Sequence, residues 1–153
     1  AVAAVVNGGY LIEPTLYPRD KSYKTNAKLI TSDVSESMRY VMREVVKNGS
    51  GKKADVDGYN VIGKTGTADK PCITGGYCGR ITSFVGAFPG NDPEYVVLVS
   101  LDNPKGKKDV RGSSAYWNAA PAAGEIIKLI APQLNIPIQN NFSIFQEHAR
   151  ADN

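Results

Sequence analysis

The chain has 153 residues, 42% hydrophobic and 22% charged, a balance typical of a globular domain, which excludes disordered, collagen-like and extended coiled-coil chains. Its 18 basic residues exceed its 15 acidic residues by only three, so the charge gives no reason to expect nucleic acid or an acidic membrane as a partner. No apolar run approaches the roughly 18 residues of a membrane span, and two cysteines are too few for a disulfide-scaffolded fold.

Two helices are predicted in the first third of the chain. A short apolar helix over residues 1–6 ends at the Asn-Gly-Gly of residues 7–9, since glycine adopts the left-handed conformation that closes a helix. A longer helix is predicted over residues 33–47, capped by Asp33 with Glu36 as its reciprocal partner. Its apolar residues recur at helical spacing and are expected on one buried face: Val34, Met38, Val41, Met42 and Val45.

Three strand-like runs follow a polar connector at residues 50–58. They cover residues 59–67, 80–88 and 94–101. The short turn at residues 89–93 favours an antiparallel hairpin between the second and third runs. The third run contains Tyr-Val-Val-Leu-Val, which is too apolar for a half-exposed strand, so we expect it in the centre of a sheet.

The last predicted helix spans residues 117–131 and is followed by Pro132. We expect Trp117 in the core beneath this helix, and a loosely ordered tail over residues 135–153. The apolar face of the helix is expected to contain Ala122, Ile126 and Ile130, with Ala119, Ala123 and Ile127 beside it. Together the elements predict an α+β fold, in which helices pack against an antiparallel sheet.

Two short motifs match catalytic patterns without the structural context that the chemistry needs. Residues 58–65 fit the phosphate-loop pattern G-x-x-x-x-G-K-[ST]. Their middle residues are strand formers, and the glycines and proline that follow prevent a helix from starting at the lysine. Ser50 and Lys53 fit S-x-x-K, the spacing of an activated serine on a helix. Ser50 lies between two glycines in the connector, so we interpret both matches as coincidences.

Lys64-Thr65-Gly66-Thr67 is the motif with the clearest chemistry. A K-T-G triplet at the end of a strand is one of three signatures of serine acyltransferases that bind penicillin. The lysine supplies positive charge beside the nucleophile, and the two threonine hydroxyls can donate to a substrate carboxylate. Gly66 removes a side chain where the substrate lies against the strand, and the amide of Thr67 points to the developing oxyanion.

Taken in order, the segments of the chain resemble the C-terminal part of the transpeptidase domain of class B penicillin-binding proteins, most closely the division-type (FtsI-like) enzymes. The resemblance covers roughly residues 1–134. It is carried by Asn7-Gly8-Gly9 followed by Ile12 and Pro14, by Val61–Ala68, Ser83–Pro89, Pro93–Val99 and Leu101–Pro104, and by Trp117–Pro121.

The resemblance implies a peptidoglycan D,D-transpeptidase that cross-links stem peptides through a serine attack on D-Ala-D-Ala and is acylated by β-lactams. Lys64 would hydrogen-bond the serine of the family's S-x-N motif, Thr65 and Thr67 would hold the carboxylate, and the N–H of Thr67 would form half of the oxyanion hole. The resemblance also implies that the protein works with divisome partners at the periplasmic face of the bacterial inner membrane. It implies no cofactor and no metal. Alternatives are a D,D-carboxypeptidase, a β-lactamase, a β-lactam sensor, or a non-catalytic binding fragment.

The sequence departs from the family pattern upstream of the K-T-G triplet. No S-x-N occurs in the chain, and no S-x-x-K helix remains once Ser50 is set aside. The chain also opens in an apolar run without an initiator methionine. We therefore expect a piece of a longer protein that cannot be acylated alone. By this resemblance the family's sheet has five antiparallel strands, and only the last three correspond to runs in this chain. The strand at 94–101 would then have an unpaired edge, which would favour self-association.

Cys72 and Cys78 lie between the first two predicted strands and outside the family pattern. Three interpretations remain open. The two cysteines could form a disulfide, which an envelope location would permit. Alternatively, they are two free thiols, or they bind a metal. The metal interpretation is the weakest because the only histidine, His148, lies far along the chain.

Overall fold

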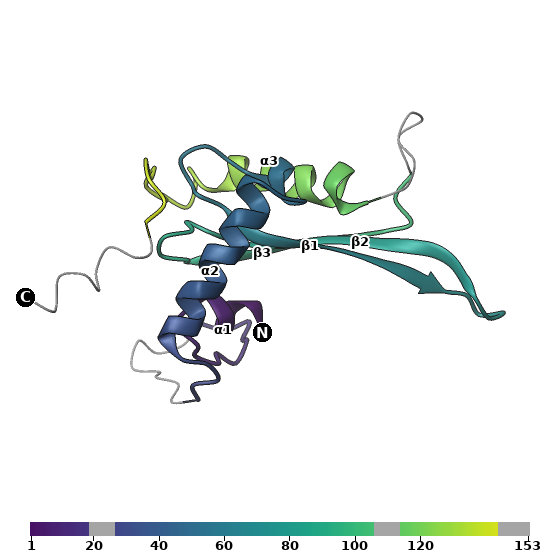
Figure 1. Cartoon of the computed structure of the whole chain (residues 1–153), viewed down its shortest axis with the longest axis horizontal. Helices are drawn as coiled ribbons and strands as arrows, with labels where there is room; N and C mark the ends of the chain where they lie inside the picture. Colours follow the sequence, from purple (N-terminus) through teal and green to yellow (C-terminus); the bar gives the residue numbers. More distant parts are fainter. Residues whose placement is uncertain (19–26, 106–113, 144–153) are drawn as a thin grey trace, which may run out of the picture.

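The computed structural model describes residues 1–18, 27–105 and 114–143 of the chain. It confirms an α+β fold, with one antiparallel sheet of three strands in the order β1-β2-β3. Helix α3 lies along one face of the sheet and α1 lies on the other side (Figure 1). The elements in chain order are α1 (Val2–Val6), α2 (Ser32–Lys47), η1 (Lys52–Ala54), β1 (Ile62–Pro71), β2 (Tyr77–Phe88), β3 (Tyr95–Asp102), η2 (Ala115–Trp117) and α3 (Ala119–Ile130). None of the helices in these described ranges has the length and apolarity needed to cross a membrane.

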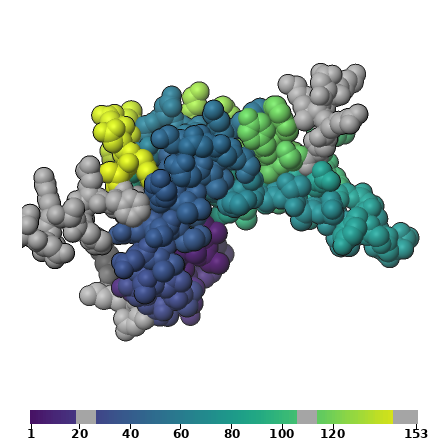
Figure 2. All heavy atoms as spheres, viewed as in Figure 1, coloured from purple at the N-terminus to yellow at the C-terminus, as the bar shows by residue number. Residues whose placement is uncertain are grey.

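Strands β1 and β2 form a long hairpin whose tip projects beyond the rest of the molecule (Figures 1 and 2). Their pairing runs from Ile62 with Ala87 to Pro71 with Tyr77. Strand β3 pairs with residues 81–88 of β2, so among the described residues no third strand lies beside the half of the hairpin nearest the tip. The β2–β3 pairing confirms the antiparallel hairpin that the short turn predicts.

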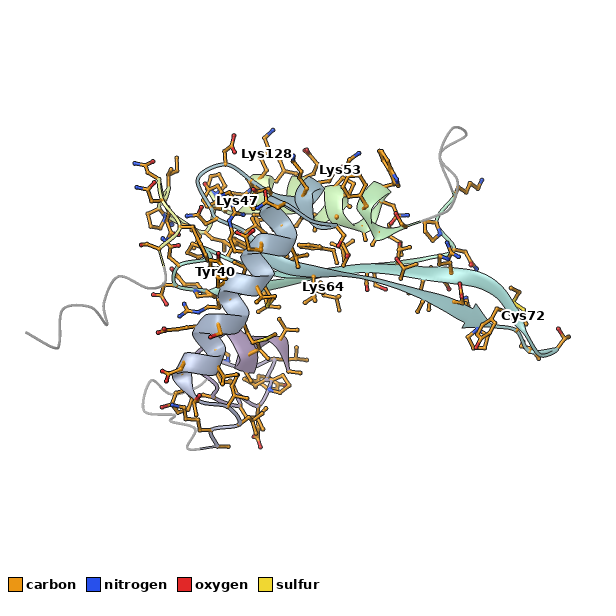
Figure 3. All side chains as sticks on the ribbon, in the orientation of Figure 1. Tyr40, Lys47, Lys53, Lys64, Cys72 and Lys128 are labelled. Atoms are coloured by element: carbon orange, nitrogen blue, oxygen red, sulfur yellow. A yellow bond between two sulfur atoms is a disulfide. The ribbon has the colours of Figure 1, made fainter. Side chains whose placement is uncertain are left out.

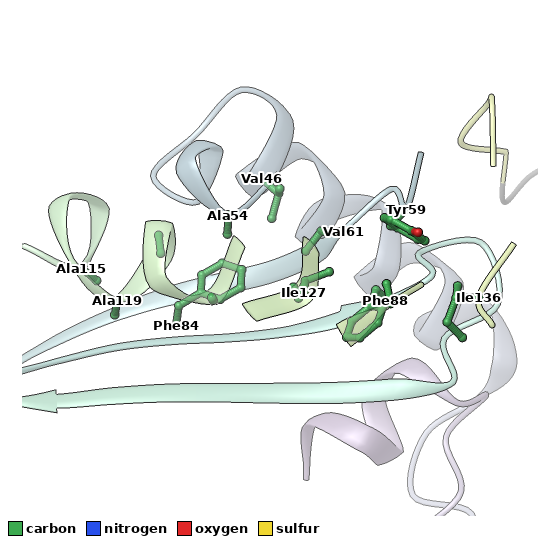
Figure 4. Close-up of a cluster of buried hydrophobic side chains, with 13 residues drawn as sticks. Val46, Ala54, Tyr59, Val61, Phe84, Phe88, Ala115, Ala119, Ile127 and Ile136 are labelled. Atoms are coloured by element: carbon green, nitrogen blue, oxygen red, sulfur yellow. The ribbon is translucent and has the colours of Figure 1, made fainter. Parts of the chain in front are cut away.

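The main core lies between the sheet and helix α3 (Figure 4). Phe84 and Phe88 project from β2 into it and are fully buried, which stabilises the fold by about 1.5–3 kcal/mol for each ring. Gly124 lets α3 approach η1 closely, because a Cβ at this position would lie 2.9 Å from the carbonyl oxygen of Lys53. The cluster comprises Val46, Ala54, Tyr59, Val61, Phe84, Phe88, Ala115, Ala119, Ala120, Ala123, Ile127, Ala131 and Ile136.

The opposite face of the sheet is covered at one end and open at β3. A smaller cluster of Val6, Met42, Ile62 and Ala87 joins α1 and α2 to the start of β1. Farther along this face, Val96 is 44% and Leu98 is 65% exposed. The prediction that β3 is central is therefore wrong for the described sheet. The apolar run shows that both faces of β3 suit burial, but it does not show what covers them.

Helix α2 begins one residue earlier than predicted, and Thr31 rather than Asp33 caps it. The Thr31 Oγ1 accepts from the amide of Val34 at 3.3 Å, whereas Asp33 lies in the first turn. Asp33 remains favourable there because a carboxylate complements the positive end of the helix dipole.

The buried face of α2 is also rotated from the predicted one. Ser35, Met42 and Val46 are buried, while Val34 and Val41 are exposed. The cause is a polar anchor: the Ser35 hydroxyl donates to the carbonyl of Val5 at 2.6 Å and accepts from the amide of Gly8 at 3.0 Å. Two tertiary hydrogen bonds thus bury a serine that the hydrophobic pattern assigns to solvent.

At the end of the chain, the predicted single helix over 117–131 is replaced by the turn η2 and helix α3. Asn118 separates them and caps α3, accepting from the amide of Ala119 at 2.6 Å. The buried face is centred on the residues predicted beside the apolar face, because Ala123 and Ile127 are buried while Ile126 is 38% exposed. Of the predicted tail, residues 144–153 lie outside the described part of the chain.

Candidate functional site

The Lys-Thr-Gly-Thr motif occupies the middle of β1, which is an edge strand of the described sheet. The strand was expected to end at Thr67, but it continues to Pro71. It continues because residues 68–71 pair with the end of β2 near the hairpin tip. An edge strand leaves a row of backbone N–H and C=O groups that can pair with an extended peptide.

The alternation along β1 places Lys64 and Gly66 on one face of the sheet, opposite Val85 and Ser83 in register. Lys64 is exposed, and its Nζ donates to the carbonyl of Thr65 at 2.8 Å (Figure 3). A Cβ at Gly66 would lie 2.6 Å from Ser83 Oγ, so a side chain there would require the Ser83 hydroxyl to rotate away. The ammonium therefore stands beside a strip of backbone that carries no side chain.

Thr65 and Thr67 project to the other face, and each side-chain oxygen has a partner within the chain. Thr65 Oγ1 is 2.6 Å from Ser50 Oγ. Thr67 Oγ1 accepts from the backbone amide of Ala115 at 3.4 Å. A hydroxyl that accepts in this way keeps its own proton for another acceptor. The two hydroxyls lie on the same face of β1 and suit the binding of an anionic group, whereas the Lys64 ammonium belongs to the opposite face.

Ser50 does not form a serine–lysine pair with Lys53. It lies in the turn after α2, while the Lys53 Nζ stacks 3.8 Å from the centre of the Trp117 ring. The prediction that Trp117 lies in the core is wrong, because its side chain is 43% exposed and packs against the Lys53 ammonium. The contact of Ser50 with Thr65 joins residues 15 positions apart, and no local pattern in the sequence indicates it.

A buried hydrogen bond anchors β2, the strand that pairs with the motif, to the start of α3. Thr82, the register partner of Thr67, is fully buried. Its Oγ1 donates to the Oδ1 of Asn118 at 2.7 Å, the same oxygen that caps α3. The cap of the last helix is thereby fixed to the strand beside the motif. The sequence signals neither residue, because the two lie 36 positions apart.

The two cysteines lie near the hairpin tip, at the far end of β1 from Lys64 (Figure 3). Cys72 and Cys78 are joined by a disulfide, with their Cα atoms 5.4 Å apart. The described residues contain no cluster of three or more side chains suited to a metal ion, and His148 lies outside them.

The phosphate-loop match does not form a phosphate site. Lys64 and Thr65, its last two residues, lie inside β1, where a phosphate loop needs the N-terminus of a helix.

Comparison with known proteins gives one family. The model of the penicillin binding protein transpeptidase domain matches residues 1–128. Stage V sporulation protein D of Bacillus subtilis is 38% identical over 154 residues, which cover 92% of this chain and 23% of that protein. The probable peptidoglycan D,D-transpeptidase FtsI of Caulobacter vibrioides is 38% identical over 148 residues, which cover 89% and 25% respectively. The chain thus spans about a quarter of the length of these curated relatives.

Solved structures show the same similarity in three dimensions. The transpeptidase domain of penicillin-binding protein 3 from Burkholderia pseudomallei superposes with a TM-score of 0.77 at 28% identity, over 90% of this chain and 41% of that one. Penicillin-binding protein 3 of Mycobacterium tuberculosis, complexed with aztreonam, gives 0.70 at 26% identity, over 91% and 35%.

Proposed function

Because the chain belongs to the penicillin-binding protein transpeptidase family, we propose that it is part of a longer peptidoglycan D,D-transpeptidase. That protein cross-links stem peptides by serine acyl transfer and is acylated by β-lactams. The observation that carries the proposal is the Lys64–Thr67 stretch on an exposed strand edge, within the segment that matches the family. A relative named as a D,D-transpeptidase supports the reaction type.

In the proposed reaction the donor peptide lies as an extended strand along β1. Its terminal carboxylate accepts hydrogen bonds from the hydroxyls of Thr65 and Thr67, while Gly66 lets the peptide backbone approach. The amide of Thr67 donates to the oxyanion of the tetrahedral intermediate, which stabilises charge that exists only during the reaction. Lys64 adds positive charge beside the reacting serine. We assign that serine and its base to residues outside these 153, so the chain alone is inactive.

The setting of the protein follows from the same proposal. Resemblance to the FtsI-like enzymes supports a role in septal wall synthesis with divisome proteins as partners. Stem peptides ending in D-Ala-D-Ala and β-lactams are the small ligands. The site would face the periplasm, with the protein held at the inner membrane by a segment that precedes these residues.

Fluorescent penicillin labelling tests the proposal on the full-length parent, the parent carrying Lys64→Ala, and the 153-residue chain. Lys128→Ala, an exposed lysine on α3, is the matched control. We expect labelled parent and control, a weakly labelled Lys64→Ala variant and an unlabelled chain. A folded parent that takes no label would overturn the enzyme proposal and leave a binding role. A labelled 153-residue chain would show that the nucleophile lies within it.

Product analysis then separates the transpeptidase from its alternatives. With stem-peptide donor and amine acceptor, we expect a cross-linked dimer together with free D-Ala. Free D-Ala without the dimer would indicate a D,D-carboxypeptidase instead.

A further inference from the structure

We propose that Ser50 is a positioning residue for the carboxylate-binding hydroxyl of Thr65. Ser50 Oγ and Thr65 Oγ1 are 2.6 Å apart, at the short end of the range for a hydroxyl pair. The inference rests on the proposed function, since it requires that Thr65 binds an anionic group on the ligand. It adds a residue from the turn after α2 to a site otherwise built on β1.

The direction of this hydrogen bond decides what Thr65 can do. In the free protein either hydroxyl can donate to the other. Once a carboxylate accepts the Thr65 proton, the Thr65 oxygen can only accept, so Ser50 must donate. A relay then runs from Ser50 through Thr65 to the carboxylate. Each bond in such a chain polarises the next, and the bond to a charged acceptor is the strongest.

Thr67 is held in an equivalent way by a different donor. Its Oγ1 accepts from the backbone amide of Ala115, which leaves its proton for the ligand. Ser50 does for Thr65 what the Ala115 amide does for Thr67. Both threonine oxygens are occupied by donors from the protein, and both hydroxyl protons are left for the same anion.

The backbone fixes Ser50 in this place. The amide of Gly51 donates to the carbonyl of Val45 at 3.0 Å, closing the turn after α2. Gly51 is buried, and a Cβ there would lie 3.3 Å from the Phe84 ring. Phe84 is also the register partner of Thr65. Phe84 therefore lies next to the turn that carries Ser50 through its ring, and next to Thr65 through the backbone pairing of β2 with β1.

The test measures acylation of the full-length parent by a penicillin with a free carboxylate and by the methyl ester of the same penicillin. Ser50→Ala and Ser50→Thr are compared with Ser37→Ala, an exposed serine on α2. For the free acid we expect Ser50→Ala to weaken initial binding by about 5- to 30-fold, the effect of losing one hydrogen bond that supports a charged group. The acylation rate constant should change by less than about twofold.

Ser50→Thr keeps the hydroxyl and should stay within about twofold of the parent, as should Ser37→Ala. With the ester, Ser50→Ala should match the parent, and thermal unfolding should be unchanged. Equal acylation of Ser50→Ala and parent by the free acid would overturn this inference alone. Equal losses with acid and ester, or a loss in Ser50→Thr as large as in Ser50→Ala, would also overturn it. A folded wild-type parent that neither penicillin acylates would overturn the proposed function and the inference together.

Discussion

Arg43 and Asp55 form a bidentate ion pair that connects helix α2 to the segment before β1. The Arg43 Nη1 lies 2.7 Å from Asp55 Oδ1, and its Nη2 lies 3.1 Å from Oδ2. The Nη1 also donates to the carbonyl of Val61 at 2.8 Å. Because Val61 directly precedes β1, this guanidinium fixes the start of the strand that carries Lys64.

Arg43→Ala should lower the free energy of unfolding of this chain by roughly 2–4 kcal/mol. The side chains of Arg43 and Asp55 are only 11% and 29% exposed, so the change leaves a largely buried carboxylate without its partner. Arg43→Lys should recover only part of this loss, because an ammonium cannot reproduce the forked geometry. Urea unfolding measures both, with Lys47→Ala, exposed on the same helix, as the control expected within about 0.5 kcal/mol.

A double-mutant cycle with Asp55→Ala isolates the pair. We expect a coupling of at least about 1 kcal/mol, since the two residues share a direct contact. Additive losses would contradict the structural role given to this ion pair.

The shared oxygen of Asn118 gives a second stability prediction. Asn118→Ala should cost roughly 2–4 kcal/mol, because it removes the cap of α3 and leaves the buried hydroxyl of Thr82 without its acceptor. Thr82→Val should cost less, about 1 kcal/mol, because Asn118 keeps its bond to the amide of Ala119. Chemical denaturation of the two variants checks the order, and a Thr82→Val loss as large as that of Asn118→Ala would contradict it.

The parts of the fold that sequence predicts are those set by local periodicity. Because a strand has a period of two, alternation in β2 puts Phe84 and Phe88 on one face and Val85 on the other. Both rings are buried in the main core, and Val85 pairs with Lys64. The buried face of α2 escapes prediction, since it depends on Ser35 bonding to Val5 and Gly8. The open face of β3 escapes it as well, because apolar residues do not state what packs on them.

The same distinction holds for the site. Lys64 and Thr67 are found from a motif whose residues are adjacent in sequence and share one strand. Ser50 is not, because its contact with Thr65 arises from the turn after α2 meeting β1. The proposed positioning contact of this site is tertiary, whereas the groups proposed to face the ligand are local in sequence.

The disulfide at the hairpin tip gives a prediction about the chain's covalent state. Under denaturing conditions without reductant, iodoacetamide should add nothing to the intact mass, because Cys72 and Cys78 are bonded. After reduction it should add two labels. Two labels without reduction would show free thiols and contradict the bond.

Removing the disulfide should affect the tip more than the body of the fold. The bond closes a span of six residues, for which chain entropy predicts about 2 kcal/mol. In the part of the chain that the structure describes, the tip half of the hairpin has no third strand beside it, so its opening need not unfold the core. In a Cys72→Ser, Cys78→Ser variant, amide exchange at Lys70 and Gly79 should accelerate while exchange at Phe84 changes little. Equal acceleration at all three amides would contradict local opening.

The outer edge of β3 should make the isolated chain self-associate. Within the described residues β3 pairs with β2 alone, and its open face exposes Leu98 at 65%. An unpaired apolar edge is a template for pairing with a second chain. Light scattering at high protein concentration should therefore give a mean mass above the 16.4 kDa of one chain. Leu98→Lys should move it towards the monomer, because a charge on an edge strand opposes such pairing. Leu129→Lys is the matched control, since Leu129 on α3 is also 65% exposed but lies off the sheet. A monodisperse wild-type monomer, or an equal effect of both lysines, would contradict association through β3.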